Sequence, residues 1–150
     1  MQHLGVRTVA HYYTFILRHI PRALKQVDKD AALAAQNLVE HAVEQGVVVN
    51  VRMMNAFLHV CKSAEELAMA KDWLEKMLSQ EHGLPEPNVM TFNIVLEACC
   101  KARARMEGHE VMASLRKSRM SPDAETYAAL VRLSETPEEA EKWLGGMGTS

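Results

Sequence analysis

The chain has 150 residues, of which 48% are hydrophobic and 24% charged, and its formal net charge is -2. This balance is typical of one globular domain or a short repeat array, and it excludes bulk disorder and collagen-like structure. The chain lacks the overall basicity of a typical free-standing nucleic-acid-binding protein. Aromatic residues are scarce at 5% and methionines number ten, which favours packed helices over a β-sandwich, so we expect an all-α fold.

The N-terminal segment is basic. The first acidic residue is Asp28, so residues 1–27 carry four basic side chains without an opposing charge: Arg7, Arg18, Arg22 and Lys25. An arginine-rich, acid-poor start is typical of a mitochondrial presequence, whereas the simpler alternative is an ordinary basic helix, which we favour. No apolar run approaches the length of a membrane span, so we expect no membrane insertion.

Four segments of the chain resemble one another and are expected to form helices. The segment from Val51 to Lys62 aligns with the segment from Val89 to Lys101, a third copy starts at Ala124, and a looser fourth starts at Ala10. Each is followed by a stretch with apolar residues three and four apart, as one face of a helix requires. These four sets are Ala35, Leu38, Val39, Ala42; Leu67, Ala70, Trp73, Leu74, Met77; Gly108, Val111, Met112, Leu115; and Ala140, Trp143, Leu144, Met147.

The ends of the repeated units are marked by turn and cap residues. Two second helices have clear expected starts, a capping box over residues 63–66 and a first-turn proline in Thr136-Pro137-Glu138-Glu139. Proline cannot continue a helix, and Asn or Asp in the tails can cap the next one. The predicted units are therefore residues 10–50, 51–88, 89–123 and a shortened 124–150, with residues 1–9 as the tail of one more unit upstream.

The unit from Val89 to Asp123 has 35 residues and three marked positions. It begins with Val-x-Thr-Phe-Asn93, its first helix closes with Cys100-Lys101, and it ends with Met120-Ser-Pro-Asp123. These features closely resemble the pentatricopeptide repeat family. The tetratricopeptide repeat is similar in length, but its Trp-x-x-Leu-Gly-x-x-Tyr signature is missing. The resemblance implies a right-handed α-solenoid of three full hairpins and a degenerate C-terminal one, with a groove lined by the first helix of each pair.

The resemblance also implies binding of single-stranded RNA at about one base per repeat. Carried over residue by residue, the base-reading pairs are Thr14 with Asn50, Asn55 with Asn88, and Asn93 with Asp123. By the same resemblance the first pair favours adenine, the second a pyrimidine and the third uracil, while Ala128 reads nothing. Helix capping is the competing explanation for Asn50, Asn88 and Asp123, but not for the asparagines inside the first helices, which are poor helix formers.

Two further groups follow from the alignment to the family. The residues flanking the base are His11, Arg52 and Met90, and the basic residues for phosphate are Arg22, Lys62 and Lys101. Only the third unit is basic overall, which adds Arg103 and Arg105 as candidate phosphate contacts. The alternative for these charges is a solvated helix end.

Catalysis finds no support in the sequence. The seven histidines form no HExxH motif, no glycine-rich phosphate loop exists, and the three cysteines, Cys61, Cys99 and Cys100, form no CxxC pair. We therefore expect a protein without enzymatic activity or cofactor, with the cysteines used in packing.

Two functions remain open. One is recognition of single-stranded organellar RNA within a larger array or ribonucleoprotein, in a mitochondrion or alternatively a plastid. The other is a scaffold that docks protein subunits or ribosomal RNA in an organellar complex such as a mitochondrial ribosome.

Overall fold

The computed structural model describes the backbone of residues 2–23 and 27–149 and the side chains of residues 10–21, 23 and 27–146. Eight α-helices and a single 3-10 turn occupy the described backbone, with no strand among them. The helices are α1 (Gln2–Ala23), α2 (Lys29–Glu44), α3 (Val51–Ser63), α4 (Leu67–Leu78), α5 (Val89–Ala102), α6 (Arg105–Lys117), α7 (Ala124–Leu133) and α8 (Pro137–Thr149), and the 3-10 turn is η1 (Glu81–Gly83).

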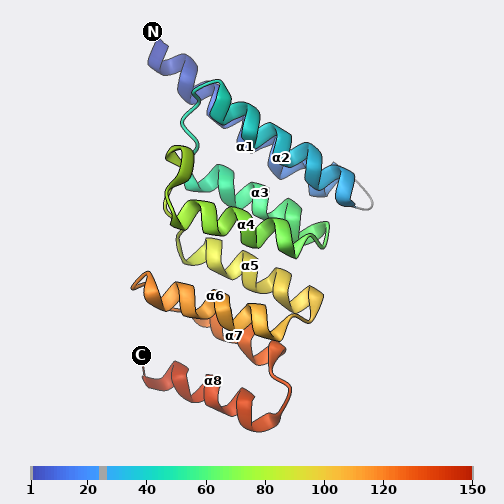
Figure 1. Ribbon diagram of the computed structural model, residues 1–150, viewed down its shortest axis with the longest axis vertical. Helices are drawn as coiled ribbons and strands as arrows, with labels where there is room; N and C mark the ends of the chain where they lie inside the picture. Colours follow the sequence, from blue (N-terminus) through green and yellow to red (C-terminus); the bar gives the residue numbers. More distant parts are fainter. Residues whose placement is uncertain (1, 24–26, 150) are drawn as a thin grey trace.

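The helices pair into four hairpins that stack along the long axis of the molecule (Figure 1). We call α1, α3, α5 and α7 the first helices and α2, α4, α6 and α8 the second helices. Neighbouring first helices pack directly against one another, and α2, α4 and α6 each pack against the first helix that follows them. A single hairpin cannot bury its own apolar stripe, so the stacked hairpins share one continuous core. Phe57 and Phe92, its largest fully buried side chains, lie on α3 and α5.

Most helix starts are set by the side chains expected from the sequence. Asn50, Asn88 and Asp123 each occupy the N-cap and accept a hydrogen bond from the backbone N–H three residues later. Asp28 does the same for α2. Each cap satisfies a backbone donor that the helix cannot satisfy internally.

The structure corrects two of the expected boundaries. Residues 2–9, expected as the tail of an upstream unit, form the first turns of α1, because no proline or cap interrupts the helix there. The capping box over residues 63–66 is wrong: Ser63 is the last residue of α3, and Glu66 at the N-cap of α4 makes no side-chain cap bond. The chain turns there through Glu65, which has a positive φ of 58°.

Polar side chains connect the second helices. The indole N–H of Trp73 donates to Gln36 at 2.9 Å, and Lys71 forms an ion pair with Glu110 at 2.9 Å. Neighbouring first helices pack directly against one another, whereas these long side chains bridge the second helices. Three of the first helices, α1, α3 and α5, also line the groove described below. None of the described helices is both long and apolar enough to cross a lipid bilayer.

Candidate nucleic-acid interface

A groove of about 880 Å³ runs across α1, α3 and the start of α5. Basic and aromatic side chains dominate its polar lining, and none of the described residues that line it is acidic. The lining residues with polar or aromatic groups are Phe15, Arg18, His19, Arg52, Asn55, His59, Lys62, Ser63 and Asn88. A chain with a net charge of -2 therefore presents a locally cationic groove.

Burial and the local charges both act on His59, which lines the groove. Burial lowers the pKa of His59, the positive charges of Lys62 and Arg18 lower it further, and Glu97 opposes them. Lys62 lies 2.8 Å from Glu97 in an ion pair. The lowered pKa favours the neutral form of the His59 imidazole at neutral pH.

Asn55 and Asn88, paired on sequence grounds, contact each other at the groove wall. The amide nitrogen of Asn55 donates to Asn88 Oδ1 at 3.3 Å, and the Thr91 hydroxyl donates to Asn55 Oδ1 at 2.6 Å. Asn88 Oδ1 also accepts the Thr91 backbone N–H at 3.0 Å as the cap of α5. Asn55 is 6% exposed, so its orientation is fixed by these partners.

The next unit repeats this arrangement. The amide of Asn93 donates to Asp123 Oδ1 at 2.9 Å, and the Thr126 hydroxyl donates to Asn93 Oδ1 at 2.6 Å. Partial burial raises the pKa of Asp123, but hydrogen bonds from the Thr126 backbone and the Asn93 amide more than offset it, so the pKa lies below its ordinary value. Asp123 is therefore a carboxylate at neutral pH.

Capping and ligand binding do not exclude each other in these two networks. A side-chain amide has two N–H donors and its oxygen has two lone pairs, and each buried asparagine uses one of each within the protein. The capping side chains Asn88 and Asp123 are exposed. Each network thus retains hydrogen-bonding groups for a planar ligand edge.

Thr91 and Thr126 are the residues that the sequence interpretation missed. Each lies three residues after the capping Asn or Asp and forms a capping box with it. The spacing Asn-x-x-Thr or Asp-x-x-Thr was a visible signal, because a capping box needs a second side chain at that position.

The first predicted pair, Thr14 and Asn50, has a different geometry. The Thr14 hydroxyl donates to the Ala10 carbonyl oxygen at 3.1 Å, and Asn50 caps α3 through the Met53 backbone N–H at 2.9 Å. Met53 stands where the other two units have threonine, so it offers no hydroxyl to connect the pair. The sequence equivalence therefore does not bring these two side chains into one network.

The predicted flanking residues Arg52 and Met90 are exposed and line the same groove as Asn55 and Asn88. His11 is exposed but is not among the residues that line the groove.

The predicted phosphate contacts differ in their surroundings. Lys62 lines the groove, and the exposed Lys101 donates to the Lys62 carbonyl oxygen at 3.3 Å. Arg103 is exposed at the C-terminal end of α5. The Arg22 side chain lies outside the described residues.

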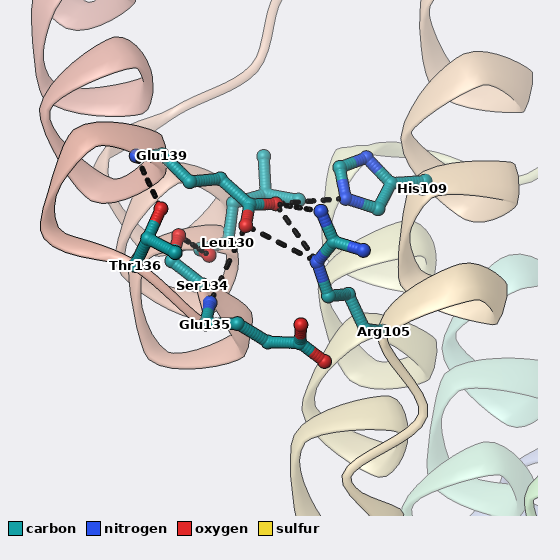
Figure 2. A network of polar contacts seen from close by, with 7 residues as sticks. All are labelled: Arg105, His109, Leu130, Ser134, Glu135, Thr136 and Glu139. Atoms are coloured by element: carbon teal, nitrogen blue, oxygen red, sulfur yellow. Dashed lines mark hydrogen bonds and ion pairs between the residues drawn. The ribbon is translucent and has the colours of Figure 1, made fainter.

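Arg105 lies outside the groove lining and forms an ion pair within the protein. Its guanidinium Nε lies 3.1 Å from both oxygens of Glu139, which also contacts His109 at 3.1 Å (Figure 2). These residues tie α6 to α8 in the layer of second helices, away from the groove. A bidentate carboxylate pair holds the Arg105 guanidinium within the protein and outside the groove lining, so its phosphate contact stays a prediction that the groove does not support.

The cysteines are core residues. Burial raises the pKa of both the Cys61 and Cys99 thiols to about 12, and Cys100 donates from Sγ to the Ala129 carbonyl oxygen at 3.3 Å. A buried neutral thiol is a weak nucleophile. Among the described residues, no group of three or more His, Cys, Asp or Glu side chains could hold a metal ion.

Comparison with known proteins identifies the repeat. The family model described as the pentacotripeptide-repeat region of PRORP matches residues 1–145. The chain is also similar to the crystal structure of the PPR domain of Arabidopsis thaliana protein-only RNase P 1 in complex with tRNA, with a TM-score of 0.71, 18% sequence identity, and coverage of 91% of this chain and 69% of that one. No curated protein matches the chain. The predicted all-α helical-repeat fold is confirmed, and the chain belongs to the pentatricopeptide repeat family.

Proposed function

We propose that this chain binds single-stranded RNA along the groove formed by the first helices, and that it does so without catalysis. The observation that carries the proposal is the local charge: three cationic side chains, of which Lys62 is paired with Glu97, and two histidines line a groove whose described lining holds no carboxylate. The chain as a whole is acidic. A cationic groove with an exposed aromatic ring is the arrangement that single-stranded nucleic acid favours. The similar Arabidopsis domain is described in complex with tRNA, which supports the same ligand class.

In this proposal the phosphate backbone follows the cationic side chains. Arg18 and Arg52 are exposed in the groove, Lys62 lines it, and Lys101, outside the lining, contacts the Lys62 carbonyl oxygen. Neutralising phosphates releases condensed counterions, so the affinity should fall with salt concentration. The exposed ring of Phe15, stacked with His19 at 4.1 Å between centroids, offers a face for a base.

Base identity is proposed to depend on the two asparagine networks. Uracil presents an N–H between two carbonyl oxygens, which suits a carboxylate acceptor beside an amide donor, as in Asp123 and Asn93. Asn88 and Asn55 offer amides only, which suits either pyrimidine. Thr14 and Asn50 are not joined by a hydrogen bond, so we expect the weakest selectivity at their position, for which adenine remains the proposed base.

The wider setting stays a proposal as well. Only about three bases would be read, so useful affinity requires a longer array or a ribonucleoprotein, and we place it in an organelle, a mitochondrion before a plastid. The competing function is protein docking, favoured by the observation that both buried asparagines are already hydrogen-bonded within the protein.

A charge-reversal pair tests the binding groove. The double variant Arg18→Glu with Arg52→Glu should bind a fluorescent single-stranded RNA more weakly, as measured by anisotropy at low salt. The slope of log affinity against log salt concentration should become smaller by about 1.4, which corresponds to two lost phosphate contacts. The matched control is Lys117→Glu with Arg119→Glu, two exposed cations outside the groove lining. Equal losses in both pairs would mean that only net charge matters. Absence of RNA binding by the unsubstituted chain would favour the scaffold.

A further inference from the structure

The first helices carry a row of four equivalent residues one helical turn after the asparagines of the two networks. Residues four apart share one face of a helix, so the row follows the same side of the first helices as the asparagines. Its members are Arg18 on α1, His59 on α3, Glu97 on α5 and Arg132 on α7. Arg18 and His59 line the groove. Glu97 thus places a carboxylate where the other three units have an arginine or an imidazole.

Glu97 holds a cation that belongs to the groove lining. Its Oε2 lies 2.8 Å from Nζ of Lys62, at the C-terminal end of α3. Lys62 is one of three cationic side chains among the described lining residues, together with Arg18 and Arg52. Glu97 itself is not among the lining residues. A carboxylate outside the lining therefore pairs with one of the three cations inside it.

The ion pair between Lys62 and Glu97 is accessible to a competing anion. The Lys62 side chain is 19% and the Glu97 side chain 33% exposed, so water reaches both charges. A pair of this kind contributes little to stability, because water solvates each charge well when the pair opens. A phosphate oxygen can accept the same charge-assisted hydrogen bond from the ammonium as the carboxylate does. Glu97 and a phosphate are therefore competitors for one ammonium group.

The charges of this pair also act on a neighbouring residue of the groove. Burial is the largest cause of the lowered pKa of His59; among the charges, Lys62 and Arg18 lower this pKa and Glu97 raises it. The carboxylate thus opposes the positive field of the two cations at a residue that lines the groove.

The chain forms the same type of bridge a second time, away from the groove. Lys71 on α4 pairs with Glu110 on α6 at 2.9 Å, just as Lys62 on α3 pairs with Glu97 on α5. Each bridge joins one unit to the next, and neither Lys71 nor Glu110 lines the groove. The second bridge therefore offers a matched comparison for the first.

We propose that Glu97 limits the affinity of the groove for RNA by competing with phosphate for Lys62. The inference rests on the proposed RNA-binding function and names a residue that tunes it. A phosphate that binds Lys62 must displace the carboxylate. The displaced carboxylate then takes up a cation from solution, which offsets the counterion that the bound phosphate releases.

Glu97→Gln tests the proposal, because it removes the charge and keeps the size of the side chain. In anisotropy titrations at low salt, this variant should bind a fluorescent single-stranded RNA about two- to fivefold more tightly than the unsubstituted chain. The slope of log affinity against log salt concentration should become steeper by about 0.7, which corresponds to one additional phosphate contact. The matched control is Glu110→Gln, which changes the net charge equally and breaks the other bridge. Its affinity should stay close to that of the unsubstituted chain.

Lys62→Gln shows whether the gain acts through the paired cation. Because the competition is for the Lys62 ammonium, adding Glu97→Gln to Lys62→Gln should not increase the affinity further. Circular dichroism confirms that each variant is folded, and Glu97→Ala replaces Glu97→Gln if it is not.

Three results would overturn the proposal while leaving the RNA-binding function intact. One is RNA binding by the unsubstituted chain that Glu97→Gln does not strengthen. Another is an equal gain in Glu110→Gln, which would mean that net charge alone matters. The third is a gain that persists in the Lys62→Gln background, which would indicate direct repulsion between Glu97 and phosphate. If neither the unsubstituted chain nor any variant binds RNA, the proposed function is wrong and this inference fails with it.

Discussion

The hydrogen-bond network around Asn93 gives a quantitative prediction about stability. Thr126→Val removes the hydroxyl that lies 2.6 Å from Asn93 Oδ1, and Asn93 is 3% exposed, so its oxygen is left buried without that donor. An unsatisfied buried polar atom costs about 1 to 3 kcal/mol. The same hydroxyl accepts the Asp123 backbone N–H at 3.1 Å, so part of the α7 cap is lost too. We expect Thr126→Val to lower the free energy of unfolding by about 2 kcal/mol.

A double-mutant cycle measures the coupling free energy between Thr126 and Asn93. Asn93→Leu should cost less, about 1 kcal/mol, because the Thr126 hydroxyl can turn toward Asp123 Oδ1, 3.0 Å away. In the double variant neither buried polar atom remains, so the loss should be smaller than the sum of the single losses by about 1 kcal/mol. Urea denaturation followed by circular dichroism measures all four free energies. Losses that add within about 0.4 kcal/mol would refute the coupling of Thr126 with Asn93.

Further predictions concern the core, the groove and a cap. Trp73 is buried edge-on against Phe57, so Trp73→Ala should lower the free energy of unfolding by about 3 to 5 kcal/mol. Trp143 is only half-buried, so Trp143→Ala should lower it by less. Similar urea midpoints for the two variants would contradict this. The lowered pKa of His59 should rise when a bound phosphate neutralises the field of Lys62 and Arg18. RNA affinity should therefore increase as pH falls below the ordinary histidine pKa of about 6.5. In anisotropy titrations, His59→Gln should remove that increase. The lowered pKa of Asp123 adds stability above the ordinary aspartate pKa of about 3.9, and that stability is lost as pH falls through the lower folded pKa. In a plot of the free energy of unfolding against pH, Asp123→Asn should reduce the loss of stability at acid pH.

Much of the fold was predictable because local chemistry and the repeat agree. Asn50, Asn88 and Asp123 were expected as possible caps from their place after each second helix, and all three cap the next helix. The apolar periodicity placed Trp73 and Leu115 in the core, where both are buried. Such features depend on neighbours in the sequence or on the helical period, so a single sequence contains them.

The remainder depends on tertiary contacts that periodicity does not encode. Leu144 continues an apolar stripe but is exposed, because no described helix follows α8 to cover it. Arg105 looked like one of several free cations near the third unit, and it is held by Glu139 from the next hairpin, 34 residues away. The Ser63 capping box failed because α3 continues to Ser63, and only the three-dimensional turn decides where one helix ends.

The predicted site depends partly on local sequence and partly on tertiary contacts. The resemblance paired Asn55 with Asn88 and Asn93 with Asp123, and the structure brings each pair into hydrogen-bonding distance. It did not reveal that threonine from the following unit fixes each asparagine, nor that Met53 leaves the first pair without such a partner. The difference arises because three residues from two units meet in each network.

The most direct test of base reading compares Asn93→Ala with Lys101→Ala on single-stranded RNA oligonucleotides that differ at one nucleotide. We expect Asn93→Ala to reduce discrimination at that nucleotide by about 1 to 3 kcal/mol. Lys101→Ala should instead weaken binding of all oligonucleotides alike and reduce the salt dependence by about one phosphate contact. An unchanged base preference in Asn93→Ala, with binding reduced only by Lys101→Ala, would contradict base reading and leave a groove that holds phosphate alone.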